Sequence, residues 1–598
     1  MRRSLLLLAA GAALVLAGCN GDGGRGLLVR GPAALLARGS GTSGSGGRVS
    51  LAVQNGLEVG LRSGARIRLP GAPRPRRDAI VAQGDFSTLD NTSVDFDPEE
   101  GSLVVAGDLV VPAGEALDVT ADAEIVSTQG NIFVLGTIAL DEETAFSLVL
   151  GSRNGAIVIG RAGEIYASGA QATPGKEVEL AASRVYLQGE AEIDASGGDG
   201  QPGGSVTIHP FSPIEVGPRA GVHCEGSTAI LADAGPAPSD VTGPGGTVRI
   251  DYAIPGLRSH LGLGGTISAG GLPGGQVLVY WGGTAVVGGS IDTTGFGSGG
   301  GADGGQILFG AVPLTGPAPS EPLDTSGRAS SSVVSPEDDI LPLLDQSLAG
   351  AGQKLVLLAA PRGVSAPAAV VDVSGGEGGS FAAASFAGGI RWGGRAAADG
   401  GGGILAFTTF GRRANIRFDG SAAATGGDTS PESGGVIVFF AADGSLDVRG
   451  TLDASGSAAA SGSDQNGGPG GIVALLCDWG GGEEFPDFER EDGIGGAIRF
   501  EGQVLARGGS GDGSGNGGNG GTIAMDADPD DLELSTHGGG RLVRGSLVDV
   551  SGGAGATAGD GGQILLRASD RSGDPTSTAG FTVEDPVDVV GYDEAEID

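Results

Sequence analysis

The stretch Ile-Asp-Ala-Ser-Gly-Gly-Asp-Gly-Gln-Pro-Gly-Gly-Ser-Val-Thr-Ile, residues 193–208, contains the two patterns that decide the fold. The first is an apolar residue, Asp, any residue, Ser or Thr, and Gly. The second is Gly-Gly, any residue, and Ile or Val. A side-chain period of two places Ile193 and Ala195 on one face of a strand and Asp194 and Ser196 on the other. The stretch therefore predicts a strand, a glycine-rich turn and a second strand.

Both patterns recur along the chain, coupled in this order. The first returns at Asp292, Asp324, Asp372, Asp453 and Asp549, with a looser copy at Asp419. The second, which begins here at Gly203, returns at Gly245, Gly274, Gly304, Gly401, Gly434, Gly470, Gly520 and Gly561. Units this short cannot bury an apolar face alone, so they must stack on one another.

The fold predicted from this repetition is all-β, a right-handed parallel β-helix (solenoid) with Gly-rich loop insertions. We expect glycine to supply the positive φ of the sharp corners. A β-propeller is the alternative architecture, but its blades repeat at nearly constant length. The units here are unevenly spaced, which a β-helix tolerates because loops can extend outward from any coil.

Composition narrows the classes of partner. The chain has 598 residues, with 121 Gly, 30 Pro, 72 acidic and 35 basic residues, and a net charge of −37. A duplex nucleic-acid binder needs a basic surface, so we expect no nucleic-acid partner. The charge is uneven, because residues 1–80 carry a net charge of +9 and residues 81–598 one of −46.

The N-terminus has the pattern of an export signal. Met1-Arg2-Arg3 is followed by an uncharged apolar stretch and then by Leu16, Ala17, Gly18 and Cys19. This order resembles the lipobox of bacterial lipoproteins. The resemblance implies cleavage before Cys19, lipidation of its thiol and a membrane anchor made of several acyl chains. It also implies an exported protein, and Asn20 favours the outer membrane or cell surface of a Gram-negative bacterium.

These observations predict four parts of the chain. They are a lipoprotein signal peptide at 1–18, a basic N-terminal linker at 19–85, the β-helix repeat domain at 86–580 and an acidic C-terminal tail at 581–598. The linker could rest on anionic headgroups beside the anchor or be solvated. Because Cys224 and Cys477 lie six units apart, we expect both thiols to be free.

The recurring aspartates are the candidates for shared chemistry. One interpretation is that each carboxylate accepts hydrogen bonds from the following Ser and Gly amides, as in an Asx turn. The other is that calcium lies between the coils, held by carboxylates and carbonyls. On that second interpretation the metal-ligating residues are Asp194, Asp292, Asp324, Asp372, Asp453 and Asp549.

Tryptophan offers a second set of candidates. All three tryptophans precede Gly-Gly. If exposed there, they could stack on sugar rings; the alternative is that they shield the ends of strands. The candidate ligand-binding residues are Trp281, Trp392 and Trp479.

The predicted function follows from the anchor and the architecture. The chain resembles β-helical surface adhesins, which implies a lipid-anchored structural or adhesive protein that is not catalytic. Its expected partners are the membrane, through Cys19, and surface polysaccharide or other cells. The alternative is a polysaccharide-active lyase or hydrolase on the same scaffold. No pair of carboxylates stands in an ordered context that hydrolysis would need, so we assign no catalytic residue.

Overall fold

We describe a computed structural model of the chain. It describes residues 27–29, 33–38, 46–53, 57–59, 72–88, 95–97, 101–141, 146–170, 172–210, 221–236, 243–252, 260–281, 284–295, 303–310, 369–376, 378–385, 388–409, 414–427, 431–442, 444–477, 497–527, 540–568, 582–583, 588–590 and 592–597.

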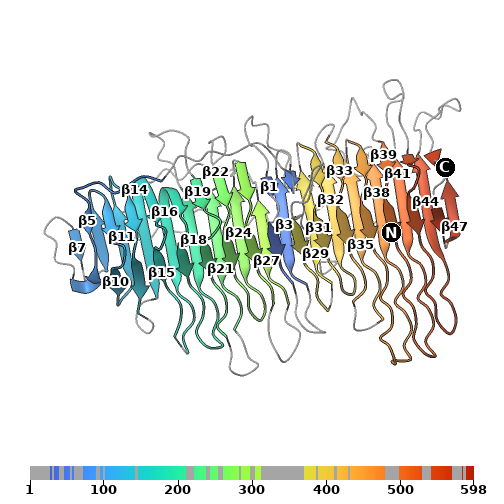
Figure 1. The fold of residues 1–598 in the computed structure, drawn as a ribbon, viewed down its shortest axis with the longest axis horizontal. Helices are drawn as coiled ribbons and strands as arrows, with labels where there is room; N and C mark the ends of the chain where they lie inside the picture. Colours follow the sequence, from blue (N-terminus) through green and yellow to red (C-terminus); the bar gives the residue numbers. More distant parts are fainter. Residues whose placement is uncertain are drawn as a thin grey trace, which may run out of the picture. The chain divides into compact units, whose positions relative to one another are not determined.

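The chain divides into two compact units, and each is a parallel β-helix. The strands of unit 1 lie in Gly26–Arg62 and Leu348–Asp598, and those of unit 2 lie in Ser63–Ser347. In each unit, successive coils contribute one strand to each of three parallel sheets, which we call sheets A, B and C. Figure 1 shows these strands lying side by side in both units. The predicted solenoid is thus confirmed.

Unit 2 is built from the following strands. Sheet A contains β7 (Asp95–Asp97), β8 (Ser102–Val105), β11 (Ala123–Ser127), β14 (Ser147–Ile159), β16 (Glu177–Leu187), β18 (Ser205–Pro210), β21 (Thr247–Tyr252), β24 (Gln276–Trp281) and β27 (Gln306–Gly310). Sheet B contains β5 (Ile80–Val81), β9 (Leu109–Val111), β12 (Ile132–Val134), the second halves of β14 and β16, β19 (Gly221–Cys224), β22 (His260–Leu263) and β25 (Thr284–Val287). Sheet C contains β6 (Gly84–Asp85), β10 (Ala116–Val119), β13 (Thr137–Leu140), β15 (Glu164–Tyr166), β17 (Glu192–Asp194), β20 (Ala229–Leu231), β23 (Thr266–Ser268) and β26 (Ser290–Asp292).

Unit 1 repeats the arrangement. Sheet A contains β3 (Arg48–Val53), β29 (Ser380–Ser385), β32 (Ile404–Thr409), β35 (Val436–Ala441), β38 (Ile472–Cys477), β41 (Thr522–Ala527), β44 (Gly562–Ala568) and β47 (Tyr592–Ile597). Sheet B contains β1 (Leu27–Val29), β4 (Leu57–Val59), β30 (Ile390–Trp392), β33 (Ile416–Phe418), β36 (Leu446–Val448), β39 (Ile498–Phe500), β42 (Gly540–Leu542) and β45 (Thr582–Val583). Sheet C contains β2 (Ala34–Leu36), β28 (Val370–Asp372), β31 (Arg395–Ala397), β34 (Ser421–Ala423), β37 (Thr451–Asp453), β40 (Gln503–Leu505), β43 (Leu547–Asp549) and β46 (Asp588–Val590).

Two elements stand apart from the parallel coils. The short 3₁₀ helix η1 (Phe86–Thr88) follows β6. Strand β7 pairs with β8 in the antiparallel direction, whereas the other pairings within unit 2 are parallel among the described residues. An antiparallel strand interrupts the coil repeat, so β7 covers the edge of sheet A that β8 would otherwise expose. Among the described residues, no helix is long and apolar enough to cross a membrane.

The alternation predicted for the repeat is present. In β17, Ile193 is fully buried and its neighbours Glu192 and Asp194 are only partly buried. Ala195, two residues after Ile193, is again fully buried. Apolar side chains at period two therefore form the interior of each coil, as the first pattern predicted.

The Gly-Gly pairs serve a different purpose from the one predicted. Apart from Gly402, the glycines of these pairs are not among the described glycines with positive φ. Instead, coils approach closely at the second glycine of the pairs other than Gly401-Gly402. A Cβ at Gly246 would lie 2.0 Å from the carbonyl oxygen of Gly204, and one at Gly275 would lie 2.1 Å from that of Gly246. Glycine is required because a side chain would collide with the backbone of the preceding coil.

Part of the range predicted as a linker belongs to the β-helix of unit 1. Strands β2, β3 and β4 pair in parallel with β28, β29 and β30, so they form a coil beside strands more than 300 residues later in the sequence. Figure 1 shows β3, in blue, next to β29. The basic composition of this range concealed a strand pattern in which Val49 and Leu51 point into the interior.

The densest basic stretch of the predicted linker lies against unit 2. The backbone amide of Arg76 donates to Oδ2 of the buried Asp108 at 2.9 Å. Ala72 and Ala79 pack against an apolar cluster on the outward face of sheet B, which includes Val110 and Phe133. This segment is therefore held by the protein itself.

Candidate functional site: recurring carboxylates and a charged ladder

The recurring aspartates occupy one structural position. Asp194, Asp292, Asp372, Asp453 and Asp549 are each the last residue of a strand in sheet C. In each case Oδ1 accepts a hydrogen bond from the backbone amide two residues later, at 2.9–3.1 Å. This is the geometry of an Asx turn, which satisfies a donor where the strand ends. Asp324 lies outside the described residues.

In two coils that lack this aspartate, the same amide donates to a carboxylate of the preceding coil. In unit 1 the sheet C strand before Thr425 ends in Ala423. The amide of Thr425 donates instead to Oδ1 of Asp399 at 3.1 Å, and the Thr425 hydroxyl donates to the same oxygen at 2.7 Å. In unit 2 the amide of Gly270 donates to Oδ1 of Asp233, because its own strand ends in Ser268.

Serine hydroxyls complete this arrangement. The amide of Asp399 donates to Oγ of Ser374 at 3.0 Å, and the amide of Arg507 donates to Oγ of Ser455 at 3.3 Å. Each acceptor lies one coil before its donor. In these coils the amide two residues after the end of the sheet C strand thus donates in one of two ways. Its acceptor is a side chain of its own coil or of the coil before it. Sequence analysis missed Asp233 and Asp399 because it looked for Asp at one motif position only. The signal was an Asp two residues later, where Ser or Thr usually stands.

Burial distinguishes the two carboxylates that bridge coils. Burial raises the pKa of Asp233, and its neighbours Asp292 and Asp194 raise it further, while hydrogen bonds from Ser268 and Gly270 oppose the shift. Burial likewise raises the pKa of Asp399, against hydrogen bonds from Thr425. Removal of a carboxylate from water disfavours its charged form.

In the structure these carboxylates accept hydrogen bonds from backbone amides. Within the described part of the chain, no group of three or more His, Cys, Asp or Glu side chains is placed to hold a metal ion. Calcium therefore stays a prediction, and its ligands would have to come in part from backbone carbonyls.

The tryptophans do not form one surface. Trp392 is fully buried in unit 1, where its ring stacks on Phe418 with centroids 5.4 Å apart. Its Nε1 donates to the carbonyl oxygen of Gly394 at 2.7 Å. Of the two interpretations, exposure for sugar stacking does not hold for Trp392, because an aromatic side chain at an inward position of β30 belongs to the core. The side chain of Trp281 and the whole of Trp479 lie outside the described residues.

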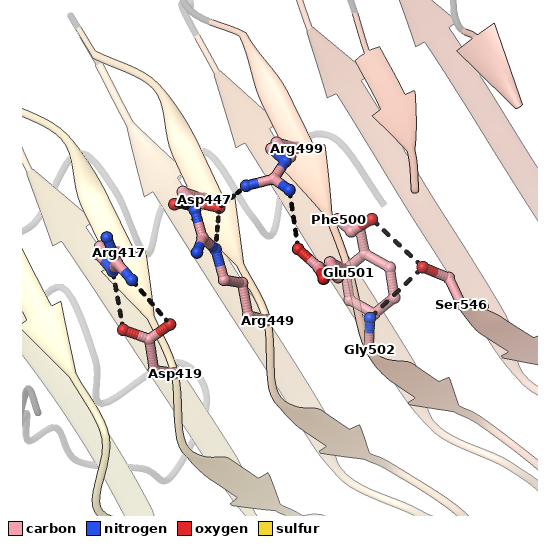
Figure 2. Close-up of polar contacts among 9 residues, drawn as sticks. All are labelled: Arg417, Asp419, Asp447, Arg449, Arg499, Phe500, Glu501, Gly502 and Ser546. Atoms are coloured by element: carbon pink, nitrogen blue, oxygen red, sulfur yellow. Dashed lines mark hydrogen bonds and ion pairs between the residues drawn. The ribbon is translucent and has the colours of Figure 1, made fainter. Parts of the chain in front are cut away.

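A ladder of charged side chains lies on the outward face of sheet B in unit 1 (Figure 2). We call Arg417, Asp419, Asp447, Arg449, Arg499 and Glu501 the charged ladder. Asp447 is its centre, because Arg449 pairs with it at 2.6 Å and Arg499 at 3.6 Å.

The ladder continues on both sides of Asp447. Arg417 pairs with Asp419 at 2.7 Å, and Arg499 pairs with Glu501 at 2.8 Å. Register explains the order, since Arg417, Asp447 and Arg499 are Cα partners on successive strands. Asp419, which the sequence suggested as a loose copy of the first pattern, follows β33 in sheet B; Ala423 occupies the corresponding position in sheet C.

The structure describes two of the three cysteines. Cys224 and Cys477 are buried thiols that form no disulfide, as predicted. Burial raises the pKa of Cys224 to about 12, which disfavours the reactive thiolate. Leu16, Ala17, Gly18 and Cys19 lie outside the described residues.

Comparison with known proteins adds no relative. No protein-family model matches the chain, and neither a curated protein nor a solved structure matches it significantly.

Proposed function

We propose that this chain is a lipid-anchored, non-catalytic β-helix that acts as a structural or adhesive element at a bacterial cell surface. The observation that carries the proposal is the use of the repeated polar side chains. The recurring aspartates, with Asp233 and Asp399, hydrogen-bond the backbone within or between coils. Side chains committed to neighbouring backbone in this way serve the cohesion of the scaffold.

The anchor follows from the lipobox resemblance at Cys19. An outer-membrane or cell-surface location in a Gram-negative bacterium fits this resemblance, and the membrane is then the first partner. Surface polysaccharide or a neighbouring cell is the second. A stack of coils offers the same side-chain positions at intervals of about 4.8 Å, and such a grid suits a repeating polymer.

The test compares the full chain with its Cys19→Ala variant. We expect an alkyne fatty acid fed to expressing cells to label the full chain and not the variant. Cells that display the lipidated chain should be retained on immobilised polysaccharide or should aggregate. The polysaccharide should be recovered intact. Shortened chains or new unsaturated sugar ends would support the polysaccharide-active alternative. Absence of the label would refute the anchor.

A calcium titration tests the metal prediction separately. Because Oδ1 of Asp194 and its counterparts already accepts a backbone amide, we expect millimolar Ca²⁺ and chelator to give the same melting temperature. A melting temperature that rises steeply with Ca²⁺ would show that the aspartates are ligands and that the turns rearrange around the ion.

A further inference from the structure

The coil that begins unit 1 is contributed by the segment closest to the predicted anchor. Strand β2 pairs with β28, and β3 pairs with β29 over six residues. Hydrogen bonds extend this pairing beyond the strands, because the amide of Ala37 donates to the carbonyl oxygen of Asp372 at 2.9 Å. The amide of Val370 donates to that of Ala33 at 3.0 Å. Strands β2, β3 and β4 are thus joined to β28, β29 and β30 by parallel pairing.

The same coil is part of the apolar interior. Five of its side chains are at most 1% exposed: Ala33, Leu35, Ala37, Val49 and Leu51. Nε of Arg38 adds an ion pair with Oδ2 of Asp372 at 3.2 Å. The contact therefore combines backbone pairing, apolar burial and charge, and apolar burial is the dominant source of stability in such contacts.

We propose that strands β2, β3 and β4 are a non-covalent clamp that fastens the rest of unit 1 to the anchor. This inference rests on the proposed lipidation of Cys19. Fifteen residue steps separate Cys19 from Ala34, the first residue of β2, so the clamp begins within roughly 54 Å of the anchored residue. The bulk of the protein is then attached to the membrane in two ways. One is the covalent chain through residues 60–71, and the other is the ladder between β2–β4 and β28–β30.

The test cuts the first attachment and leaves the second. A protease site is inserted between Arg62 and Ser63 of the full lipidated chain, and membranes are washed after cleavage. We expect the fragment that starts at Ser63 to stay on the membrane until denaturant is added. A control site between Gly23 and Gly24 lies before the clamp and should release the protein at once. Release of the Ser63 fragment by buffer alone would overturn the proposal.

A glycine substitution tests the contact itself. A Cβ at Gly46 would lie 1.7 Å from the carbonyl oxygen of Val373 and 2.5 Å from the amide nitrogen of Gly379. Gly46→Val should therefore loosen the clamp, so that cleavage after Arg62 releases the fragment. The matched control is Gly107→Val, because no atom lies within 4 Å of a Cβ at Gly107. That variant should retain the fragment as the parent does.

A covalent lock covers the case in which Gly46→Val fails to fold. Ser50 and Ala382 are Cα partners across β3 and β29, a spacing that a disulfide can bridge. After cleavage, the Ser50→Cys, Ala382→Cys double variant should migrate at full size on a non-reducing gel. It should separate into two fragments on reduction, and two fragments without reductant would contradict the clamp.

Failure of the clamp and failure of the lipid anchor give different results. An N-terminal affinity tag on a chain without its signal peptide replaces the lipid by a resin. If the Ser63 fragment stays on the resin and the full chain takes up no fatty-acid label in cells, the clamp is supported and the anchor is refuted. If the full chain is labelled at Cys19 but the Ser63 fragment is released from the resin, the anchor is supported and the clamp is refuted.

Discussion

The two units build the same coil with different interiors. In unit 2 the middle residue of the sheet C strands is isoleucine in succession, as at Ile165, Ile193 and Ile230, all at most 1% exposed. In unit 1 the corresponding residues of β31 and β34 are Ala396 and Ala422. The aliphatic volume that fills unit 2 is thus missing from sheet C in these coils of unit 1.

Aromatic rings on the other two sheets replace that volume. The coils of Ala396 and Ala422 carry Trp392, Phe407, Phe418 and Phe439, which are all fully buried. Phe407 and Phe439 stack with centroids 4.3 Å apart and an angle of 3° between the rings. The comparison teaches that the cross-section of a coil is set by its backbone, and that large residues on two sheets require small ones on the third.

Removal of the largest ring should have the largest effect. Trp392→Ala leaves a cavity beside Phe418 and removes the donor to the carbonyl oxygen of Gly394. We expect a loss of about 3–5 kcal/mol in the free energy of unfolding, measured by urea denaturation of the full chain. A loss below about 1 kcal/mol would mean that the surrounding rings collapse into the space.

Addition of volume to the alanine layer should cost less. Ala422→Ile inserts into unit 1 the residue type that unit 2 uses, and overpacking of this kind costs about 1–3 kcal/mol. Ala423→Ile is the matched control, since Ala423 follows it on the same strand but is only partly buried. Equal urea midpoints for both variants would argue against the proposed sharing of volume between sheets.

The carboxylates that hydrogen-bond the backbone should have intermediate effects. Asp453→Ala removes the acceptor for the amide of Ser455 and should lower the free energy of unfolding by about 1 kcal/mol. Asp453→Asn keeps an acceptor oxygen and should restore most of the loss. If the Asn and Ala variants had the same urea midpoint, the turn hydrogen bond would have no measurable value.

The carboxylates that bridge coils should make stability depend on pH. The pKa of Asp399 is raised in the folded state, so the folded chain binds more protons than the unfolded chain above the ordinary value of 3.8. The free energy of unfolding should therefore fall as pH rises through this range. Asp399→Asn keeps the acceptor and should reduce the slope of melting temperature against pH. An unchanged slope would assign the pH dependence to other groups.

The outward faces of sheet B supply the smallest expected effect. In unit 2 this face is apolar, with Phe133, Val158 and Tyr186 in one cluster, whereas in unit 1 it carries the charged ladder. Asp447→Ala should lower the free energy of unfolding by about 0.2–1 kcal/mol, and the loss should shrink with added salt, because the ladder is partly exposed. A loss that is insensitive to salt would indicate packing by the arginine side chains rather than charge pairing.

Much of the architecture could be predicted from local patterns. The alternation around Ile193 and the repetition of Asp with Gly-Gly predicted short strands that stack in parallel, because a period of two and a coil too small to bury itself are properties of the sequence alone. The Asx turns at Asp194 and its counterparts were one of the two interpretations that the sequence left open. They involve residues only two apart, so local sequence contained the information needed.

The remaining features depend on contacts between distant residues, which only the tertiary structure decides. The clamp joins β3 to β29, the charged ladder joins Arg417 to Asp447 and Arg499, and Asp399 serves an amide in the next coil. Trp392 is inside because of the register of β30, although its Gly-Gly context resembles that of the other tryptophans. The sequence by itself determined the coil, since a coil depends on local period. The tertiary structure decided which side chains of different coils meet, because these contacts join residues tens to hundreds of positions apart.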